Sequence, residues 1–175
     1  MVNDPHIESY LEIPLFEGLS EDEAHEIISL AKPRWFEKDE LIFKEGDHSN
    51  SIYLLEEGAI VVKKMQGKTD QIIAHVKAKS IFGEMALTTD DPRAASVIAS
   101  TKVHAGEILC DDFRKLLSSQ SPAASKVALN IARVLASRVN FLLEQLSCLC
   151  LDNIADEDAT ELAAFRQQVF SEWSF

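Results

Sequence analysis

The hydrophobic positions of this chain of 175 residues change their spacing twice, and the first part has the spacing of a helix. Ser20 followed by Glu23 is the sequence signature of a capping box, which marks a helix start. Apolar residues then recur on one helical face, at Ala24, Ile27, Ile28 and Ala31. Pro33 lacks the N–H that a helix interior needs, so we expect it to end this helix. The pattern predicts N-terminal helices within residues 1–33.

Short apolar runs broken by turn residues replace the helical spacing between Arg34 and Cys110. The runs have the length and composition of strands and cover residues 41–43, 52–55, 59–62, 71–76, 96–99 and 103–108. Glycine turns at Gly46, Gly58 and Gly67 separate several of them. Many short strands at regular spacing indicate an antiparallel β-roll, a jelly-roll-like barrel, over residues 34–110.

The last part of the chain returns to helical spacing. A short capped helix is expected over residues 111–117, and Ser121 followed by Pro122 is the start signal of a long helix. This helix is expected to run to about Leu149, and one apolar stripe follows it at Ala128, Ile131, Leu135, Val139, Leu142, Leu146 and Leu149. The predicted fold class is therefore mainly β with flanking helices, the last of which is long.

The apolar stripe of the long helix has two interpretations. It can pack on the chain's own sheets, which suits its first half, or it can meet a second copy of the chain. In the second half, Phe141, Leu142 and Leu143 widen the apolar face beyond what a small roll covers. We therefore expect a homodimer through the helix 122–149.

Residues 151–175 are acidic, and we expect them to form a partly helical tail behind one domain of residues 1–150, in which helices 111–150 follow the roll. An amphipathic pattern in the tail is formed by Leu162, Phe165, Val169, Phe170 and Trp173. Its expected role is to cover exposed apolar surface, and a lid over a ligand is the alternative. The tail has neither the length nor the positive charge of a DNA-reading domain.

The composition argues against several partners. The chain has 17 basic and 29 acidic residues and a net charge of −12, which argues against general affinity for nucleic acid or anionic membranes. The N-terminus lacks a secretory signal, and no apolar run reaches the roughly 18 residues of a membrane span. Cys110, Cys148 and Cys150 form no disulfide framework, and the histidines lack ligand spacing. We expect a cytoplasmic protein with reduced thiols and without a metal or cofactor.

The stretch with the clearest chemistry is residues 82–97, called the cassette below. It predicts a strand end, Gly83, one helical turn, an Asp-Asp-Pro turn and a second strand. A helix start offers free N–H groups to an anion, and Arg93 offers a planar guanidinium to the same anion. Glu84, beside this anion site, is suited to accept hydrogen bonds from hydroxyl groups. An anion with a neighbouring hydroxyl describes a sugar phosphate.

The cassette closely resembles the phosphate-binding cassette of the cyclic-nucleotide-binding domain family, which includes the regulatory subunit of protein kinase A and the catabolite activator protein. The family pattern of F-G-E, a small or apolar residue, A-L, a short turn and P-R-A-A-S/T-V is matched without a gap. Residues 44–47 and 56–58 resemble the turn signatures that precede it, so the resemblance extends from Leu15 to about Leu146. The alternative is a β-turn-β unit with an incidental surface arginine.

The resemblance implies roles for the cassette residues. Arg93 is expected to pair with a cyclic phosphate, and backbone amides of Ala86 and of Ala94 or Ala95 are expected to complete the cradle. Glu84 is expected to accept the ribose 2′-hydroxyl. The alternative for Glu84 is a structural ion pair with Arg93, and both roles are compatible while the pocket is empty.

The sugar and the base are expected to lie against the sheet. Gly83 lets the backbone approach the sugar closely. By the same resemblance, the base meets apolar strand residues at Val62, Ile73 and Val76, with Met85 nearby. We therefore expect the ligand to lie between the cassette and the strands.

Base identity is expected to depend on the residue after the cassette arginine. Family members that prefer cyclic GMP often have threonine there, whereas this chain has Ala94, which favours cyclic AMP over cyclic GMP. The long helix of the family usually provides a side chain that covers the base. Arg138 is expected to do so, from its own or the second subunit, with Arg133 and Asn130 as alternatives.

The turn before the cassette departs from the family pattern. Family members usually have a glycine shortly before F-G-E, and residues 78–81 contain none. This turn carries no expected ligand contact, so the departure concerns only its shape.

No catalytic site is expected. The chain shows no nucleophile–base pair, paired carboxylates or metal cluster, and a phosphodiesterase would need metal ligands to activate water. The expected function is a stand-alone cyclic-nucleotide sensor whose ligand moves the long helix and signals to a partner protein that the sequence does not name. The alternatives are a non-binding pseudo-receptor, against which the intact Glu84 and Arg93 argue, and a cyclic-nucleotide hydrolase.

Overall fold

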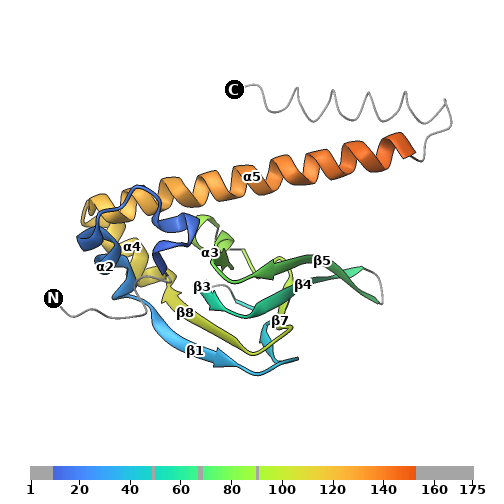
Figure 1. Ribbon diagram of the computed structural model, residues 1–175, viewed down its shortest axis with the longest axis horizontal. Helices are drawn as coiled ribbons and strands as arrows, with labels where there is room; N and C mark the ends of the chain where they lie inside the picture. The colour runs from blue at the N-terminus through green and yellow to red at the C-terminus, as the bar shows by residue number, and fades with distance from the viewer. Residues whose placement is uncertain (1–9, 49, 67–68, 90, 153–175) are drawn as a thin grey trace. The chain divides into compact units, whose positions relative to one another are not determined.

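The computed structural model describes residues 10–48, 50–66, 69–89 and 91–152 (Figure 1). They fall into two compact units, one that reaches Ala132 and one that begins at Arg133. The predicted acidic tail lies outside the described residues, except for Leu151 and Asp152, which end the long helix.

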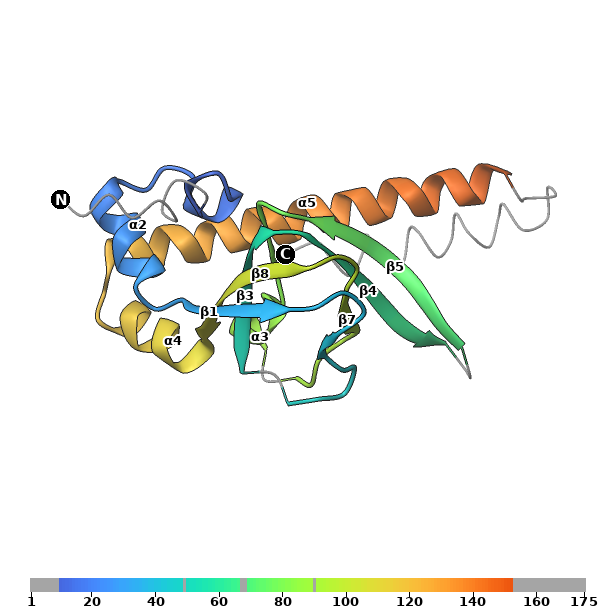
Figure 2. The same ribbon diagram turned by 60° about the horizontal axis from the view of Figure 1, so that its bottom comes forward.

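In the described residues, eight strands form two four-stranded antiparallel sheets. One sheet has the order β1 (Lys32–Phe36), β8 (Val103–Leu109), β3 (Ser51–Glu57) and β6 (Ser80–Phe82). The other has the order β2 (Leu41–Phe43), β7 (Ser96–Ala99), β4 (Ala59–Gln66) and β5 (Thr69–Lys77), and Figure 2 shows β4 and β5 as a long hairpin. The predicted antiparallel β-roll is confirmed, although its two sheets stay open and do not close into a barrel.

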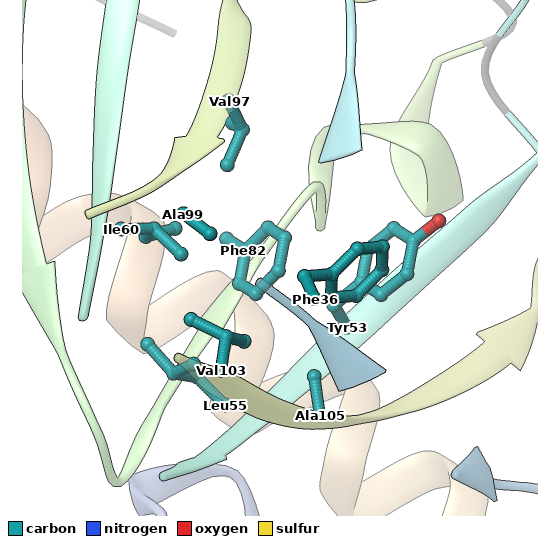
Figure 3. Packing of buried hydrophobic residues seen from close by; sticks show 9 residues of the cluster. All are labelled: Phe36, Tyr53, Leu55, Ile60, Phe82, Val97, Ala99, Val103 and Ala105. Atoms are coloured by element: carbon teal, nitrogen blue, oxygen red, sulfur yellow. The ribbon is translucent and has the colours of Figure 1, made fainter. Parts of the chain in front are cut away.

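One hydrophobic core draws on both sheets (Figure 3). Its buried members alternate along their strands, because successive strand side chains point to opposite faces. They are Phe36, Tyr53, Leu55, Ile60, Phe82, Val97, Ala99, Val103 and Ala105, with Ile42, Phe43, Val62 and Val76 packed against them. Burial of each large side chain stabilises the fold by about 1.5–3 kcal/mol. This core fixes the strands that carry both ends of the cassette.

The N-terminal part contains the 3-10 helix η1 (Pro14–Phe16) and helix α2 (Glu21–Ile28). The predicted capping box is confirmed, because the Ser20 N–H donates to Glu23 Oε2 at 2.7 Å and the Glu23 N–H donates to Ser20 Oγ at 3.3 Å. The prediction that Pro33 ends this helix is wrong, since α2 already ends at Ile28. Pro33 lies in β1, an edge strand, where a residue without an N–H is tolerated.

Three helices follow the first strands: α3 (Met85–Thr88), α4 (Cys110–Ser118) and α5 (Pro122–Asp152). The side-chain cap expected for α4 is absent, because β8 runs directly into the helix and the capping position is Leu109. Asp111 and Asp112 in the first turn instead favour the helix through its dipole. The cap of α5 is as predicted, since the Ala124 N–H donates to Ser121 Oγ at 3.2 Å.

Residues 122–132 of α5 belong to the first unit and pack on it. Their buried side chains are Ala123, Ala124, Val127 and Ile131. Asn130 Nδ2 donates to the carbonyls of Leu15 and Glu17, each at 2.9 Å. The start of α5 therefore packs on the chain's own domain. Of the predicted stripe, Ile131 is buried there and Ala128 is half-buried.

The second unit begins inside α5. Its described apolar side chains include three that are exposed, Val139, Phe141 and Leu142. No helix in the described ranges is both long enough and apolar enough to cross a membrane.

Candidate functional site

The cassette has the predicted local structure. β6 ends at Phe82, Gly83 follows with φ +73°, and α3 and β7 come next. The Ala86 N–H donates to the Gly83 carbonyl at 3.2 Å, and the Leu87 N–H donates to the Glu84 carbonyl at 3.0 Å. Glycine is favoured at a positive φ because it has no Cβ. The turn between β6 and α3 therefore requires Gly83.

The guanidinium of Arg93 lies inside the domain, and the residue is only 7% exposed. Nη1 donates to the Gly83 carbonyl at 3.2 Å, and Nη2 donates to the Ser51 carbonyl at 2.8 Å and to Ser51 Oγ at 3.1 Å. The Cζ atom lies 4.0 Å from the centroid of the Phe43 ring, which is a cation–π contact. Arg93 is therefore not an incidental surface arginine.

The backbone of Arg93 is fixed by the turn that follows β2. The Arg93 N–H donates to the Asp47 carbonyl, and the Gly46 N–H donates to the Arg93 carbonyl, each at 2.9 Å. The Asp47 carboxylate closes this turn by accepting from the Lys44 N–H at 2.9 Å. The turn signature at 44–47 and the cassette are thus parts of one structure.

The charge of Arg93 is poorly compensated in the free domain. Burial lowers the pKa of Arg93, and Tyr53, Cys110 and Glu107 act in the opposite direction. An arginine nevertheless stays protonated. Among the described residues, no carboxylate forms an ion pair with this guanidinium, and its buried Nε has no hydrogen-bond partner. A buried cation with an unused donor is suited to bind an anion.

Glu84 is also buried, at 4% exposure. It lies at the N-cap of α3 and makes no side-chain cap hydrogen bond. It directly follows Gly83, whose carbonyl accepts a hydrogen bond from Arg93 Nη1. Glu84 is therefore part of the turn to which the guanidinium is bound. Within the described part of the chain these two side chains form no ion pair with each other. The role of Glu84 as a hydroxyl acceptor stays a prediction.

Helix α3 is attached to α4 through Arg114. Ala86 is buried, and its carbonyl accepts a hydrogen bond from Arg114 Nη2 at 3.2 Å. Sequence analysis did not single out Arg114, because a basic residue on an amphipathic helix gives no signal of its own. The contact connects the predicted phosphate cradle to the helix that precedes α5.

The other end of the cassette is held by the hairpin of β4 and β5. Ala94 is exposed and Ala95 is half-buried, and the Ala94 carbonyl accepts from Lys64 Nζ at 2.8 Å. Lys64 also lies 3.6 Å from a Glu45 carboxylate oxygen. The side chain of Ala94 is therefore exposed, whereas that of Arg93 before it is buried and held by its contacts.

The predicted base-contacting residues differ in burial. Val62 and Val76 are half-buried and pack against the core, whereas Ile73 is 55% exposed. Ile73 is the extra residue of a β-bulge in β5, because Val62 pairs with Ala74, Lys63 pairs with Ile72, and Ile73 between them is skipped. Met85 is exposed on α3. The structure thus brings two of the three strand residues together at the core edge and leaves Ile73 outside.

Arg138, expected to cover the base, is half-buried in α5 and belongs to the second unit. Its role stays a prediction. In the residues that the structure describes, no group of three or more histidine, cysteine, aspartate or glutamate side chains is arranged to hold a metal ion.

In the turn before the cassette, which contains no glycine, a lysine has the positive φ that glycine favours. Lys79 has φ +66°, in the left-handed region that costs a non-glycine residue about 1–2 kcal/mol. Its N–H donates to the Leu55 carbonyl at 2.8 Å, and the Ala78 N–H donates to the Gly58 carbonyl at 2.9 Å. The departure from the family pattern therefore lies in the residue at this turn, which still takes the conformation that glycine favours.

Sequence analysis missed two partners of Arg93, Ser51 and Phe43. Ser51 opens β3 and Phe43 ends β2, and neither has a motif around it. Only the pairing of the strands brings them to an arginine far along the chain. A phenylalanine or serine in a β-rich region has no spacing signal that could have identified this role.

The sequence profile of the cyclic nucleotide-binding domain matches residues 33–120, about half of the chain. The chain therefore belongs to this family, and the resemblance inferred from the cassette is confirmed.

Particular relatives show how widely the domain occurs. A cAMP-dependent protein kinase regulatory subunit of Emericella nidulans is 38% identical over 111 residues, which are 63% of this chain and 26% of that protein. Glutaminase 1 of Bradyrhizobium diazoefficiens is 32% identical over 128 residues, 73% of this chain and 20% of that protein. The crystal structure of a cyclic nucleotide-binding domain from Methylobacillus flagellatus matches with a TM-score of 0.75 and 26% identity, covering 87% of each chain. The chain thus spans about a quarter or less of the length of these curated relatives.

Proposed function

We propose that this domain binds cyclic AMP in preference to cyclic GMP, and that binding moves α5 and signals to a partner protein. The observation that carries the proposal is the buried guanidinium of Arg93, whose Nε has no hydrogen-bond partner among the described residues. A ring phosphate supplies both the missing acceptor and the missing negative charge. In a low-dielectric interior, such a charge-assisted pair is stronger than at the surface.

The hydrogen bonds of the free domain are compatible with a bound phosphate. Ser51 accepts from Nη2 through two different atoms, and Gly83 accepts one hydrogen bond from Nη1. The Nε–H and the second hydrogen of Nη1 remain for phosphate oxygens. The phosphate therefore binds without breaking the contacts that hold Arg93.

Glu84 supports recognition of the sugar. A cyclic 3′,5′-phosphate leaves the 2′-hydroxyl as the free hydroxyl of the ribose, and a carboxylate accepts a strong hydrogen bond from it. Glu84 is buried and belongs to the same turn as the Arg93 contact at Gly83. The domain should therefore distinguish a cyclic ribonucleotide from its 2′-deoxy analogue.

Two observations support cyclic AMP over cyclic GMP. By the resemblance, Ala94 takes the position at which family members that prefer cyclic GMP often have threonine. Several similar proteins, including the one from Emericella nidulans, are named cAMP-dependent protein kinase regulatory subunits. Within the first unit, Val62 and Val76 remain the proposed contacts of the base.

The output of the domain is proposed to run through α5, which also forms a homodimer. The exposed Val139, Phe141 and Leu142 of its second unit support an apolar contact with a second copy. Within the first unit, α4 binds the cassette helix through Arg114 and is followed directly by α5. A ligand that changes the position of α3 can therefore change the position of α4 and of the start of α5.

A domain that keeps the roll as an interaction module without nucleotide is the second candidate. It is favoured by the hydrogen bonds that Arg93 already makes to Ser51 and Gly83, and by the Phe43 ring against it. In that case the guanidinium is a structural element of the roll and needs no ligand.

Thermal unfolding of the purified full chain separates the two candidates. Ligand at 100 times its Kd adds about 2.7 kcal/mol to the free energy of unfolding. For a chain of this size, the midpoint should rise by roughly 5–10 °C with cyclic AMP, less with cyclic GMP at equal concentration, and not with linear 5′-AMP. If neither cyclic nucleotide moves the midpoint, the interaction module is the better account. A larger shift with cyclic GMP would overturn the assignment of the base.

A further inference from the structure

Arg93 is connected to Glu107 through two hydroxyl groups. Arg93 Nη2 lies 3.1 Å from Ser51 Oγ, Ser51 Oγ lies 3.3 Å from the Tyr53 hydroxyl oxygen, and that oxygen lies 3.0 Å from Glu107 Oε1. At the far end, Arg34 Nη1 lies 2.9 Å from Glu107 Oε2. This chain of hydrogen bonds is called the relay below.

Sheet pairing brings the relay together. Tyr53 on β3 pairs directly with Glu107 on β8, and Ser51 is the preceding residue on the same face of β3. On β1, Arg34 pairs with Ala105, the neighbour of Glu107 on the same face of β8. The relay therefore follows one row across three adjacent strands, from the cassette arginine to an edge strand.

Chemistry fixes the direction of every hydrogen bond in the relay. A guanidinium only donates and a carboxylate only accepts. Ser51 Oγ accepts from Arg93, so its own hydrogen goes to Tyr53, and the Tyr53 hydrogen goes to Glu107. In both hydroxyl groups the oxygen therefore faces the Arg93 end of the relay and the hydrogen faces the Glu107 end. This orientation of the dipoles stabilises the positive charge of Arg93 and the negative charge of Glu107.

The Tyr53 hydroxyl is held in place by its ring. The ring stacks on Phe82 with centroids 4.9 Å apart and an interplanar angle of 9°. Figure 3 shows the hydroxyl at the edge of the core cluster, pointing away from its other members. Burial, more than its other surroundings, raises the pKa of Tyr53, so the hydroxyl keeps its proton and remains a donor at neutral pH.

We propose that Tyr53 and Glu107 are positioning residues for the phosphate of the ligand, acting through Ser51 on the orientation of Arg93. They do not touch the ligand; they hold the guanidinium so that its Nε–H stays available. If the relay is broken, Arg93 spends part of its time in other orientations, and the apparent Kd rises by the inverse of the competent fraction. This inference rests on the proposed function.

A pair of matched tyrosine variants tests the relay. Tyr53→Phe removes the hydroxyl and keeps the stacked ring. Tyr10→Phe removes a hydroxyl that binds Glu56, a different carboxylate on β3. Since one net hydrogen bond is at stake, Tyr53→Phe should raise the Kd for cyclic AMP roughly two- to tenfold, and Tyr10→Phe should leave it unchanged. Ser51→Ala, which breaks the relay without touching the core, replaces Tyr53→Phe should that variant fail to fold.

A double-mutant cycle separates positioning from a general structural effect. Arg93→Lys keeps the charge but lacks the planar guanidinium that the relay orients. In that background, Tyr53→Phe should change the Kd by less than about 1.5-fold, because its effect passes through the guanidinium. An equal loss of affinity in both backgrounds would overturn the proposal.

The ligand-free protein provides a test that does not depend on nucleotide binding. The Arg93 Nε–H signal in a ¹H–¹⁵N spectrum can be assigned by its loss in Arg93→Lys. Tyr53→Phe should shift or broaden this signal, and Tyr10→Phe should not. If wild-type protein binds no cyclic nucleotide, the proposed function is wrong, but the Arg93 signal still tests whether Tyr53 orients Arg93. An unchanged Arg93 signal in Tyr53→Phe would show that it does not, even if cyclic AMP binds.

Discussion

A Cβ atom built on Gly83 would lie 2.7 Å from Nη1 of Arg93. The same Nη1 donates to the Gly83 carbonyl at 3.2 Å. Gly83 therefore allows the positive φ of the turn, leaves the space that the guanidinium occupies and accepts one of its hydrogen bonds. The glycine and the arginine of the cassette therefore depend on each other for their conformations.

Gly83→Ala should weaken cyclic AMP binding at least about tenfold and lower the free energy of unfolding by about 1–3 kcal/mol, since the new methyl group displaces the guanidinium and strains the backbone. Gly18→Ala is the matched control, because Gly18 also has φ +73° and nothing lies within 4 Å of its added Cβ. That variant should show the backbone cost alone, with unchanged binding. Calorimetric titration and denaturant unfolding measure the two effects. Equal affinities in the two variants would mean that the close approach to Arg93 is irrelevant.

Arg93→Leu should weaken cyclic AMP binding at least about tenfold, because it removes charge-assisted hydrogen bonds worth about 1.5–3 kcal/mol to the phosphate. Lys64→Leu is the control for the change of net charge, since Lys64 binds the Ala94 carbonyl at the cassette but is exposed. Its effect should stay below about threefold. Titration with cyclic AMP at two salt concentrations checks both variants. Equal effects of the two substitutions would place the phosphate away from Arg93.

The cassette could be predicted from the sequence because its chemistry is contiguous. Gly83, Glu84 and Arg93 lie within one short stretch, whose turn, helix and strand follow from local residue preferences. Ser51 and Phe43 could not be predicted, because they reach Arg93 only through the antiparallel pairing of distant strands. The sequence pattern of a strand gives its faces, whereas its partner and register depend on the whole fold.

The same limit explains the error at Pro33. Proline ends helices, but it also fits an edge strand, and only the sheet order reveals that β1 lies at an edge. For α5, the helical spacing predicted a long helix that starts after Ser121. The residues buried at its start are Ala123, Ala124, Val127 and Ile131, and of these only Ile131 belongs to the predicted stripe.

Ala94→Thr should raise the affinity for cyclic GMP relative to cyclic AMP by roughly two- to tenfold, the effect of one added hydrogen bond to the guanine amino group. Ala94 is exposed and its carbonyl accepts a hydrogen bond from Lys64, so a larger side chain fits without repacking the core. Ala95→Thr is the control at the next, half-buried position and should leave the ratio unchanged. Competition titrations with both nucleotides give the ratio. An unchanged ratio in Ala94→Thr would show that the base lies elsewhere.

Stability should fall as the pH rises above about 9. Burial raises the pKa of the Cys110 thiol above its ordinary value of 9.0, so the unfolded chain loses this proton before the folded domain does. In that range the unfolded state binds fewer protons, and the free energy of unfolding decreases with pH. The contribution is complete below pH 9.0 and is lost as the pH passes the raised pKa of the folded state.

Denaturant unfolding between pH 7 and pH 10 measures this slope. Tyr53, whose pKa burial raises above 10.0, adds to the decline at the upper end. Cys110→Ala should flatten the curve near pH 9 and leave the decline from Tyr53 in place. A slope near pH 9 that is the same in wild-type protein and Cys110→Ala would contradict the assignment to the thiol.

The exposed apolar side chains of α5 should form the contact between two copies of the chain. Phe141 and Leu142 are 58% and 57% exposed in the single chain, a costly arrangement for neighbouring large side chains in water. Replacing both with serine should convert a dimer into a monomer, measured by light scattering over a range of concentrations. Leu129→Ser is the control, because Leu129 is 54% exposed on the same helix but lies in the first unit. It should leave the dimer intact. If wild-type protein has the mass of one chain at all concentrations, the predicted dimer is wrong.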